Sequence, residues 1–361
     1  MFLSMRPRMF AAAVTLSLFL ASGARAQYKR TDLVTDTGVE GTLADSNLVN
    51  AWGLTSLPTS PFWVSDNATG QSTLYTGTGH KLGLTVAIPA AGGGQGTPSG
   101  IVANPTGEFV VSENGKSGTA LFIFATLDGT ISGWNPGVAG ISSTGASHAT
   151  IGANRSDVGA IYTGLAIGSN GGHNFLFAAD DGPNRRVDIF DAAFHLLDLG
   201  PDAFADPEIP RNFAPYGIQT ITAANGTQTV WVTYTAFNKA QGGFVDSFTT
   251  AGVLISHFAV LGPLHSPWGV ALAPADFGPM SNALLITNNI SRGRVNAFDP
   301  KSGAFLGPLR DVSGQPIEID GLWGIQFGKD ASANGTHNQL FFTAGPNNYA
   351  NGIFGVITLA Q

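Results

Sequence analysis

The chain contains no cysteine and few charged residues. None of its 361 residues is Cys, and Asp, Glu, Lys and Arg together make up 11%. Disulfides and a cysteine-linked lipid anchor are therefore excluded, so the fold must be stabilised by core packing alone. Residues 27–361 hold 14 basic and 24 acidic side chains, a net charge near −10, and the basic ones are scattered. Nucleic acid is not expected as a partner.

Long hydrophobic runs are absent beyond the N-terminal segment. Residues 1–26 have the features of a secretory signal, with an early basic region, an apolar stretch and the small-x-small site Ala24-Arg25-Ala26. The sequence thus predicts an exported protein, periplasmic or extracellular, with no membrane span after signal cleavage. We expect residues 27–361, which are 361 − 26 = 335 residues, to form one domain and to act as a monomer.

Common catalytic motifs are also missing. The sequence has no G-x-S-x-G nucleophile motif, no P-loop and no H-E-x-x-H zinc motif. His173 and His337 occur in two similar segments, each in the turn before an expected strand, which favours a structural role for both. No reaction is indicated by a local motif.

A short motif built on one glycine occurs six times. The spacings between successive anchor glycines are 47, 64, 53, 52 and 55 residues, with a mean of 271/5, or about 54. Such a period is typical of one propeller blade. The anchors are Gly53, Gly100, Gly164, Gly217, Gly269 and Gly324. The sequence therefore predicts an all-β fold, a six-bladed β-propeller.

Two further apolar runs follow each anchor and are rich in β-branched and aromatic residues, as strands are. The expected second strands are 62–67, 109–114, 176–181, 230–234, 284–289 and 340–345. The expected third strands are 72–75, 120–124, 186–190, 243–248, 294–298 and 352–357. The last copy is one strand short, and residues 28–35 form a spare strand before the first anchor. We expect this segment to complete the last blade and join the two ends of the chain.

The residues around each anchor suggest close packing at the ring axis. Glycine allows the backbones of neighbouring first strands to approach closely. The adjacent aromatic residues, such as Trp52 and Trp268, then either fill the wedge between blades or stack on a ligand.

Acidic and amide residues end most of the second strands. By propeller geometry these positions gather at one mouth of the axis. The binding candidates there are Asp66, Asn67, Glu113, Asn114, Asp180, Tyr234, Asn288 and Asn289. Oxygen ligands from several blades suit Ca²⁺, and its candidate ligands are Asp66, Glu113, Asn114, Asp180 and Asn288. The same residue types also cap turns by bonding their own backbone, so both interpretations stay open.

Longer motifs carry a family resemblance. The segments Asn47-Leu48-Val49-Asn50-Ala51-Trp52-Gly53-Leu54 and Asp320-Gly321-Leu322-Trp323-Gly324-Ile325 are similar to those of an uncharacterised family of exported bacterial proteins, some with PEP-CTERM tails. The residue pattern that repeats from blade to blade also resembles that of NHL-repeat propellers and of the calcium-dependent lactonases of the gluconolactonase type. The latter resemblance implies an axial metal held by Glu, Asn and Asp residues from separate blades.

Three functions are consistent with these observations. The leading hypothesis is an exported propeller that binds or scaffolds a small molecule, glycan or protein partner. The alternative is a Ca²⁺-dependent hydrolase of the lactonase type, with the axial ion polarising a carbonyl. A quinone-dependent sugar dehydrogenase has less support, and its only candidate cationic residues are Arg185, Arg186, Arg292 and Arg294.

Overall fold

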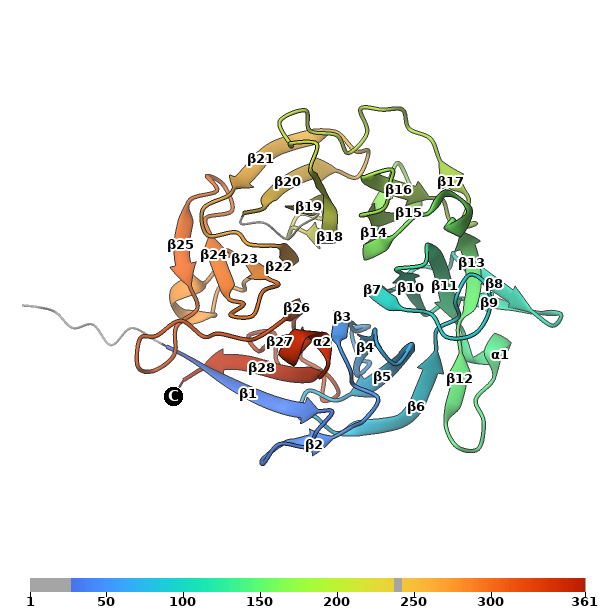
Figure 1. Cartoon of the computed structure of the whole chain (residues 1–361), viewed down its shortest axis with the longest axis horizontal. Helices are drawn as coiled ribbons and strands as arrows, with labels where there is room; N and C mark the ends of the chain where they lie inside the picture. The colour runs from blue at the N-terminus through green and yellow to red at the C-terminus, as the bar shows by residue number, and fades with distance from the viewer. Residues whose placement is uncertain (1–26, 237–241, 361) are drawn as a thin grey trace, which may run out of the picture.

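The protein is a ring of six sheets, each of four or five strands, around a central axis (Figure 1). The computed structural model describes residues 27–236 and 242–360, so the expected signal segment 1–26 lies outside the described residues. The six-bladed β-propeller predicted from the anchor spacing is confirmed, and each anchor glycine lies in the innermost strand of a blade. No helix in the described part of the chain is long and apolar enough to cross a membrane.

Within each blade the strands are antiparallel and run outward from the axis. Blade 1 contains β3 (Ala51–Thr55), β4 (Phe62–Asp66), β5 (Gln71–Tyr75) and β6 (Lys81–Ala87), and blade 2 contains β7 (Pro98–Ala103), β10 (Phe122–Thr126), β11 (Thr130–Trp134) and β13 (Thr150–Asn154). Blade 3 contains β14 (Tyr162–Asn170), β15 (His173–Asp180), β16 (Arg186–Phe190) and β17 (Leu196–Leu197). Blade 4 contains β18 (Phe213–Thr222), β19 (Gln228–Ala236), β20 (Phe244–Thr249) and β21 (Leu254–Val260). Blade 5 contains β22 (Pro267–Leu272), β23 (Leu284–Asn288), β24 (Val295–Phe298) and β25 (Phe305–Pro308).

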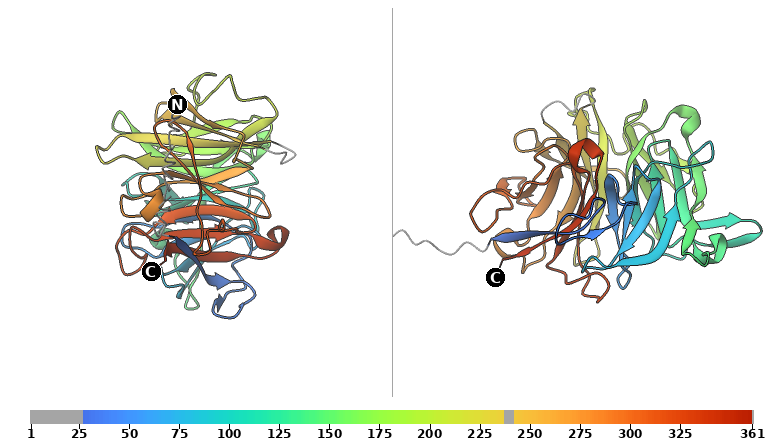
Figure 2. Two further views of the ribbon diagram at one scale, coloured as in Figure 1. Left: turned by 90° about the vertical axis from the view of Figure 1, so that its left-hand side faces the viewer. Right: turned by 60° about the horizontal axis from the view of Figure 1, so that its bottom comes forward.

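Blade 6 is built from both ends of the chain. It contains β26 (Leu322–Phe327), β27 (Leu340–Ala344) and β28 (Ile353–Leu359), then β1 (Tyr28–Thr35), with β2 (Leu43–Ala44) at its edge. Strand β1 runs antiparallel to β28, with Tyr28 opposite Leu359 and Thr35 opposite Ile353. Figure 2 shows the two strands side by side. The N-terminal strand thus occupies the position expected from the spare segment before the first anchor.

Blade 2 differs from the sequence prediction. Residues 109–114 were expected to be its second strand, but the strand that pairs with β7 is β10. Instead β8 (Val110–Glu113) pairs only with β9 (Lys116–Thr119), in a hairpin that projects from the ring (Figure 1). The prediction was wrong because the hairpin strand and the true second strand are both rich in β-branched or aromatic residues, and only tertiary pairing distinguishes them.

The remaining elements are short. Strand β12 (Ala146–His148) adds to the outer edge of blade 1 by pairing in parallel with β6. The helices are α1 (Pro136–Ala139) and α2 (Pro346–Tyr349), and Ser156–Val158 and Gly278–Met280 form single 3₁₀ turns. The hydrophobic core lies between the blades, where buried aromatic and branched side chains of adjacent sheets pack together. This arrangement leaves the axis and the blade interfaces as places for a site.

Candidate functional site

Aromatic side chains from four blades fill the propeller axis. Each comes from the residue just before an anchor glycine, and these residues are Trp52, Tyr216, Trp268 and Trp323, here called the axial cluster. The rings of Trp52 and Trp323 stack with centroids 3.8 Å apart, and Trp268 Nε1 donates to the Thr163 carbonyl at 3.0 Å. The aromatic residues predicted to fill wedges between blades therefore pack against one another at the centre of the ring.

A strained turn lies against the axial cluster. Asn347, Asn348 and Tyr349 in α2 have φ values of 56°, 53° and 67°, in the left-handed region that is costly for residues with a Cβ. This turn brings the Tyr349 ring to 5.6 Å from that of Trp323 and lets its hydroxyl donate to Asn289 Oδ1 at 2.8 Å. The axis is thus filled by side chains at the mouth where a metal ion was expected.

The two mouth asparagines connect adjacent blades. Asn67 Nδ2 donates to the Pro98 carbonyl at 3.0 Å, and Asn289 Nδ2 donates to the Leu322 carbonyl at 3.3 Å. In each case the acceptor belongs to the first strand of the next blade. These amides stabilise the ring.

Asp180 and Asn288 cap turns. Asp180 Oδ1 accepts from the backbone N–H groups of Ile161 and Gly182, both at 2.8 Å. Asn288 Oδ1 accepts from the His265 N–H at 3.1 Å, while its Nδ2 donates to the Pro263 carbonyl at 2.8 Å. Of the two interpretations left open by the sequence, these contacts favour turn capping.

Asp66 is buried inside blade 1. Its side chain is fully buried, and neither carboxylate oxygen accepts a hydrogen bond of ordinary geometry, although Thr73 lies beside it. Burial raises the pKa of Asp66 well above its usual value, and the nearby Asp45 raises it further. The Asp66 carboxyl therefore lies beside Thr73 of β5, within the same blade.

Glu113 and Asn114 lie away from the axis, on the β8–β9 hairpin. Glu113 Oε2 contacts His148 Nε2 at 2.7 Å, and Asn114 is one of two left-handed residues of the hairpin turn, with φ 52°. The placement of these two residues at the axial mouth was wrong, because it assumed that residues 109–114 were a blade strand. The expected calcium ligands are therefore spread over separate environments, and the structure does not gather them around one position.

Tyr234 also requires a correction. Its side chain is 4% exposed and lines a pocket between blades 3 and 4, instead of the axial mouth. This blade 3–4 pocket has a volume of about 540 Å³. Three arginines line it, Arg185, Arg186 and Arg211, together with Asp206 from the loop between β17 and β18.

One residue of the pocket lining, Asp206, belongs to a group of two aspartates and a histidine. Asp246 and His257 are directly opposite each other on the paired strands β20 and β21. Asp206 reaches them from the β17–β18 loop, seen above blade 4 in Figure 1. Phe204 anchors that loop, because its buried ring packs 5.2 Å from Phe177 and 5.3 Å from Phe248.

The geometry of this group is tight. His257 Nδ1 lies 2.7 Å from Asp206 Oδ2 and 2.9 Å from Asp246 Oδ1. The side chains of Asp206 and Asp246 are 1% and 0% exposed, and that of His257 is 21% exposed. Burial raises the pKa of Asp246 to about 7, with a further contribution from the negative charge of Asp206. A metal ion can be held where ligand atoms of at least three His, Cys, Asp or Glu side chains lie close together. Within residues 27–236 and 242–360, Asp206, Asp246 and His257 meet this condition.

Sequence reasoning missed this group for a clear reason. Its members are separated by 40 and 11 residues, so no local spacing motif connects them. The one usable signal was the β20–β21 hairpin, whose register pairs Asp246 with His257. The position of Asp206 depends on how a long loop folds over two blades.

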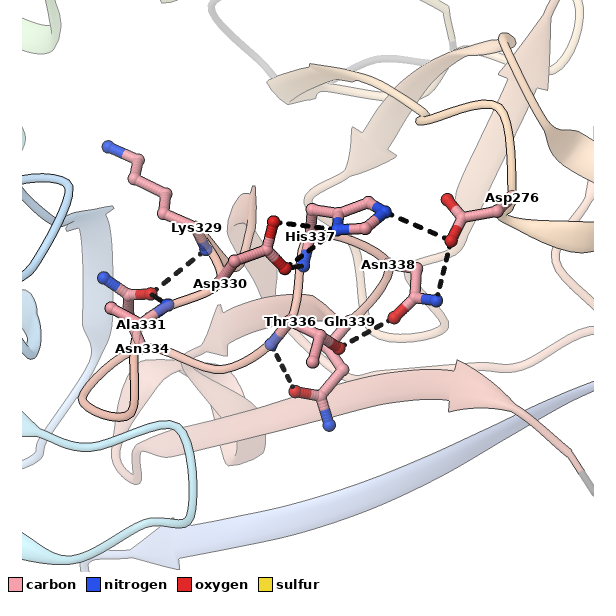
Figure 3. A network of polar contacts seen from close by, with 9 residues as sticks. All are labelled: Asp276, Lys329, Asp330, Ala331, Asn334, Thr336, His337, Asn338 and Gln339. Carbon is pink, nitrogen blue, oxygen red and sulfur yellow. Dashed lines mark hydrogen bonds and ion pairs between the residues drawn. The ribbon is translucent and has the colours of Figure 1, made fainter.

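A second histidine contacts two aspartates on the surface (Figure 3). His337 Nδ1 lies 2.8 Å from Asp330 Oδ1, and its Nε2 lies 3.1 Å from Asp276 Oδ2. The hydrogen bond to Asp330 and the charge of Asp276 raise the pKa of His337. Because the two carboxylates contact different ring nitrogens, this bridge joins the loops of blades 5 and 6 without gathering three ligand atoms.

Comparison with known proteins shows the fold but no activity. No known protein family has a model that matches the chain. Uncharacterized protein L690 of Acanthamoeba polyphaga mimivirus is 29% identical over 346 residues, covering 93% of this chain and 87% of that protein. Uncharacterized protein R648 of the same virus is 27% identical over 348 residues, covering 91% and 80%. These relatives are viral, so the expected resemblance to exported bacterial proteins is supported only in its propeller part.

The overall arrangement also resembles that of a solved structure. The putative oxidoreductase (glucose dehydrogenase) from Thermus thermophilus aligns over 91% of this chain and 99% of its own, with a TM-score of 0.51 and 12% identity. At that identity the similarity concerns the propeller fold alone.

Proposed function

We propose that the protein is an exported, monomeric ligand-binding module, and that the blade 3–4 pocket binds a small anionic molecule. The observation that carries the proposal is the grouping of Arg185, Arg186 and Arg211 around one pocket of about 540 Å³. That volume is within the range of small-molecule sites.

The arginines are notable because cations are scarce in this chain. Only 14 basic residues occur in 27–361, against 24 acidic ones, yet three of the 14 line this pocket. Guanidinium groups bind carboxylates and phosphates through paired hydrogen bonds. Arg186 Nε already contacts Asp188 Oδ1 at 2.6 Å, and Arg185 donates to the Arg211 carbonyl, so both side chains are held in position beside the pocket.

The alternative, a Ca²⁺-dependent hydrolase with an axial ion, has less support. Its expected ligands lie apart, with Asp66 inside blade 1, Asp180 capping a turn and Glu113 on the projecting hairpin. The axial cluster, which packs together from four blades, is aromatic and contributes no carboxylate to such an ion.

The proposal is tested by ligand screening of the purified protein. We expect sugar acids, dicarboxylates or organic phosphates to raise the melting temperature, and neutral sugars to have no effect. Replacing Arg211 by Gln should weaken binding of each hit by about tenfold, the loss expected for one charge-assisted hydrogen bond. Lys301→Gln is the matched control, since Lys301 is exposed on the distant β24–β25 turn. Hits that bind R211Q and wild type equally, or binding of neutral glycans alone, would overturn the proposal.

A further inference from the structure

We propose that Asp206, Asp246 and His257 bind one divalent transition-metal ion, with Zn²⁺ the best chemical match, beside the blade 3–4 pocket. The inference concerns the ion alone and does not depend on the organic ligand proposed above.

The first argument is geometric. One nitrogen and two carboxylate oxygens, contributed by β20, β21 and the β17–β18 loop, lie within 4.8 Å of one another. Three protein ligands with a fourth position left for water or substrate is the usual arrangement of a non-structural zinc site. Asp206 also lines the blade 3–4 pocket, so the ion would lie next to that pocket.

The second argument concerns which oxygen of Asp246 can bind the ion. The Tyr234 hydroxyl and Asp246 Oδ2 are both buried, and neither makes a hydrogen bond of ordinary geometry. Tyr234 is only 4% exposed, and its hydroxyl lies beside the Asp246 carboxyl, close enough for the two groups to share a hydrogen bond of less than ideal geometry. Tyr234 thus contacts one side of the Asp246 carboxyl, and the other oxygen, Oδ1, is directed at His257 and is available to an ion.

The third argument is charge. Two carboxylates buried beside each other repel, and removing each from water is costly. A single imidazole contacts both, through the same Nδ1 atom. One imidazole proton cannot satisfy both carboxylates fully, whereas a dication would attract both. A bound ion would also reduce the repulsion between these carboxylates and an anionic ligand entering past the arginines.

The ligand types favour a transition metal over calcium. Ca²⁺ and Mg²⁺ are bound by six or more oxygen atoms, whereas an imidazole nitrogen with carboxylates suits Zn²⁺ and its neighbours. Asp206, Asp246 and His257 together offer one imidazole and two carboxylates, which is too few oxygen atoms for a typical calcium site.

The test is a titration of the EDTA-stripped, purified protein with Zn²⁺, without any organic ligand. We expect one ion per chain and a rise in melting temperature, since an ion that binds only the native state stabilises it. Asp206→Asn and His257→Gln should each weaken binding at least tenfold and abolish the rise. Ca²⁺ should not compete. Co²⁺ should give visible ligand-field absorption in wild type that disappears in both variants, a signal that a purely structural role would not produce.

The matched control is His337→Gln. His337 also contacts two aspartates, but through different ring nitrogens and on the surface. We expect H337Q to bind Zn²⁺ and Co²⁺ as wild type does. Circular dichroism in EDTA checks that the variants are folded, and Asp246→Asn provides a further variant if one of them is not. The proposal is overturned if wild type binds no zinc, or if folded D206N and H257Q bind it unchanged. Because no organic ligand is present, either result leaves the anion-binding proposal to its own test.

Discussion

At the scale of single residues, hydroxyl groups next to the axis connect neighbouring blades. Thr233 Oγ1 accepts from the Gly217 N–H at 2.9 Å and donates to the Pro267 carbonyl of the next blade at 2.7 Å. Thr287 and Thr343 likewise accept from the anchor glycine of their own blade and donate to a first-strand carbonyl of the next blade, that of Trp323 and of Trp52. Ser65 is the corresponding residue of blade 1, but its buried hydroxyl has no hydrogen-bond partner.

This difference gives a matched pair of substitutions. Thr233→Val keeps the side-chain shape but leaves the Pro267 carbonyl and the Gly217 N–H without this partner. We expect a loss of about 1–3 kcal/mol in the free energy of unfolding, measured by urea denaturation. Ser65→Ala should change it by less than about 0.5 kcal/mol. Equal losses in the two variants would show that the shared hydroxyl contact does not stabilise the ring.

The buried carboxyl of Asp246 predicts a pH dependence. Its folded-state pKa of about 7 lies above the ordinary value of 3.8, so the native state keeps a proton that the unfolded chain releases. The free energy of unfolding should therefore fall as pH rises from about 4 to about 7, and this contribution should stay constant at higher pH. Asp246→Asn cannot ionise, so its stability relative to wild type should increase across that window. This relative stability is measured as the difference in melting temperature between D246N and wild type, in EDTA at several pH values. A difference that does not change with pH would contradict the raised pKa of Asp246.

At the scale of elements, the two strands β1 and β8 show why composition alone is insufficient. Strand β1 and the hairpin strand β8 are both short β-rich segments. Yet β1 pairs with β28 along its length, whereas β8 pairs only with β9. Tyr28 also donates from its hydroxyl to the Phe277 carbonyl at 2.7 Å, which connects β1 to blade 5.

Removing β1 should therefore destabilise the whole ring. A variant that lacks residues 27–35 loses the buried side chains of Tyr28 and Val34 and exposes the edge of β28. Their burial contributes about 1.5–3 kcal/mol each, so we expect the melting temperature to fall by roughly 10 °C or more, with a tendency to aggregate. The control is a variant in which Asn-Gly replaces residues 112–117 of the β8–β9 hairpin. Its melting temperature should change by only about a degree or two. A β1 deletion that melts like this control would contradict the closure role of the strand.

At the scale of the whole molecule, the anchor glycines form a closed ring of close backbone contacts. A Cβ on Gly53 would lie 2.4 Å from the Ser99 carbonyl of blade 2, and one on Gly217 would lie 2.1 Å from the Trp268 carbonyl of blade 5. The last glycine, Gly324, faces the Trp52 carbonyl of blade 1 and completes the circle. The blades can approach the axis this closely because these positions lack a side chain.

A methyl group at this contact should push the blades apart. Gly217→Ala should lower the free energy of unfolding by about 1–3 kcal/mol or more, because the atom it meets is rigid backbone. Gly92→Ala is the control, since a Cβ there meets open space and its φ is outside the left-handed region. Differential scanning calorimetry measures both, and G217A as stable as G92A would contradict the packing argument.

The sequence by itself determined the repeat architecture. Glycines such as Gly217 and Gly269 are needed in every blade for the same steric reason, so their spacing is visible along the chain. Local composition likewise located five of the six expected second strands. These features are local or periodic, and this is why they could be predicted.

The candidate site was decided only by the tertiary structure. Asp206, Asp246 and His257 meet because a long loop is anchored by Phe204 between two blades and because one hairpin has a particular register. The acidic residues at strand ends were visible in the sequence, but whether Asp180 caps a turn or binds an ion depends on which N–H groups reach it. Side-chain direction and long-range contacts leave no periodic trace in a chain, and the placement of functional groups depends on both.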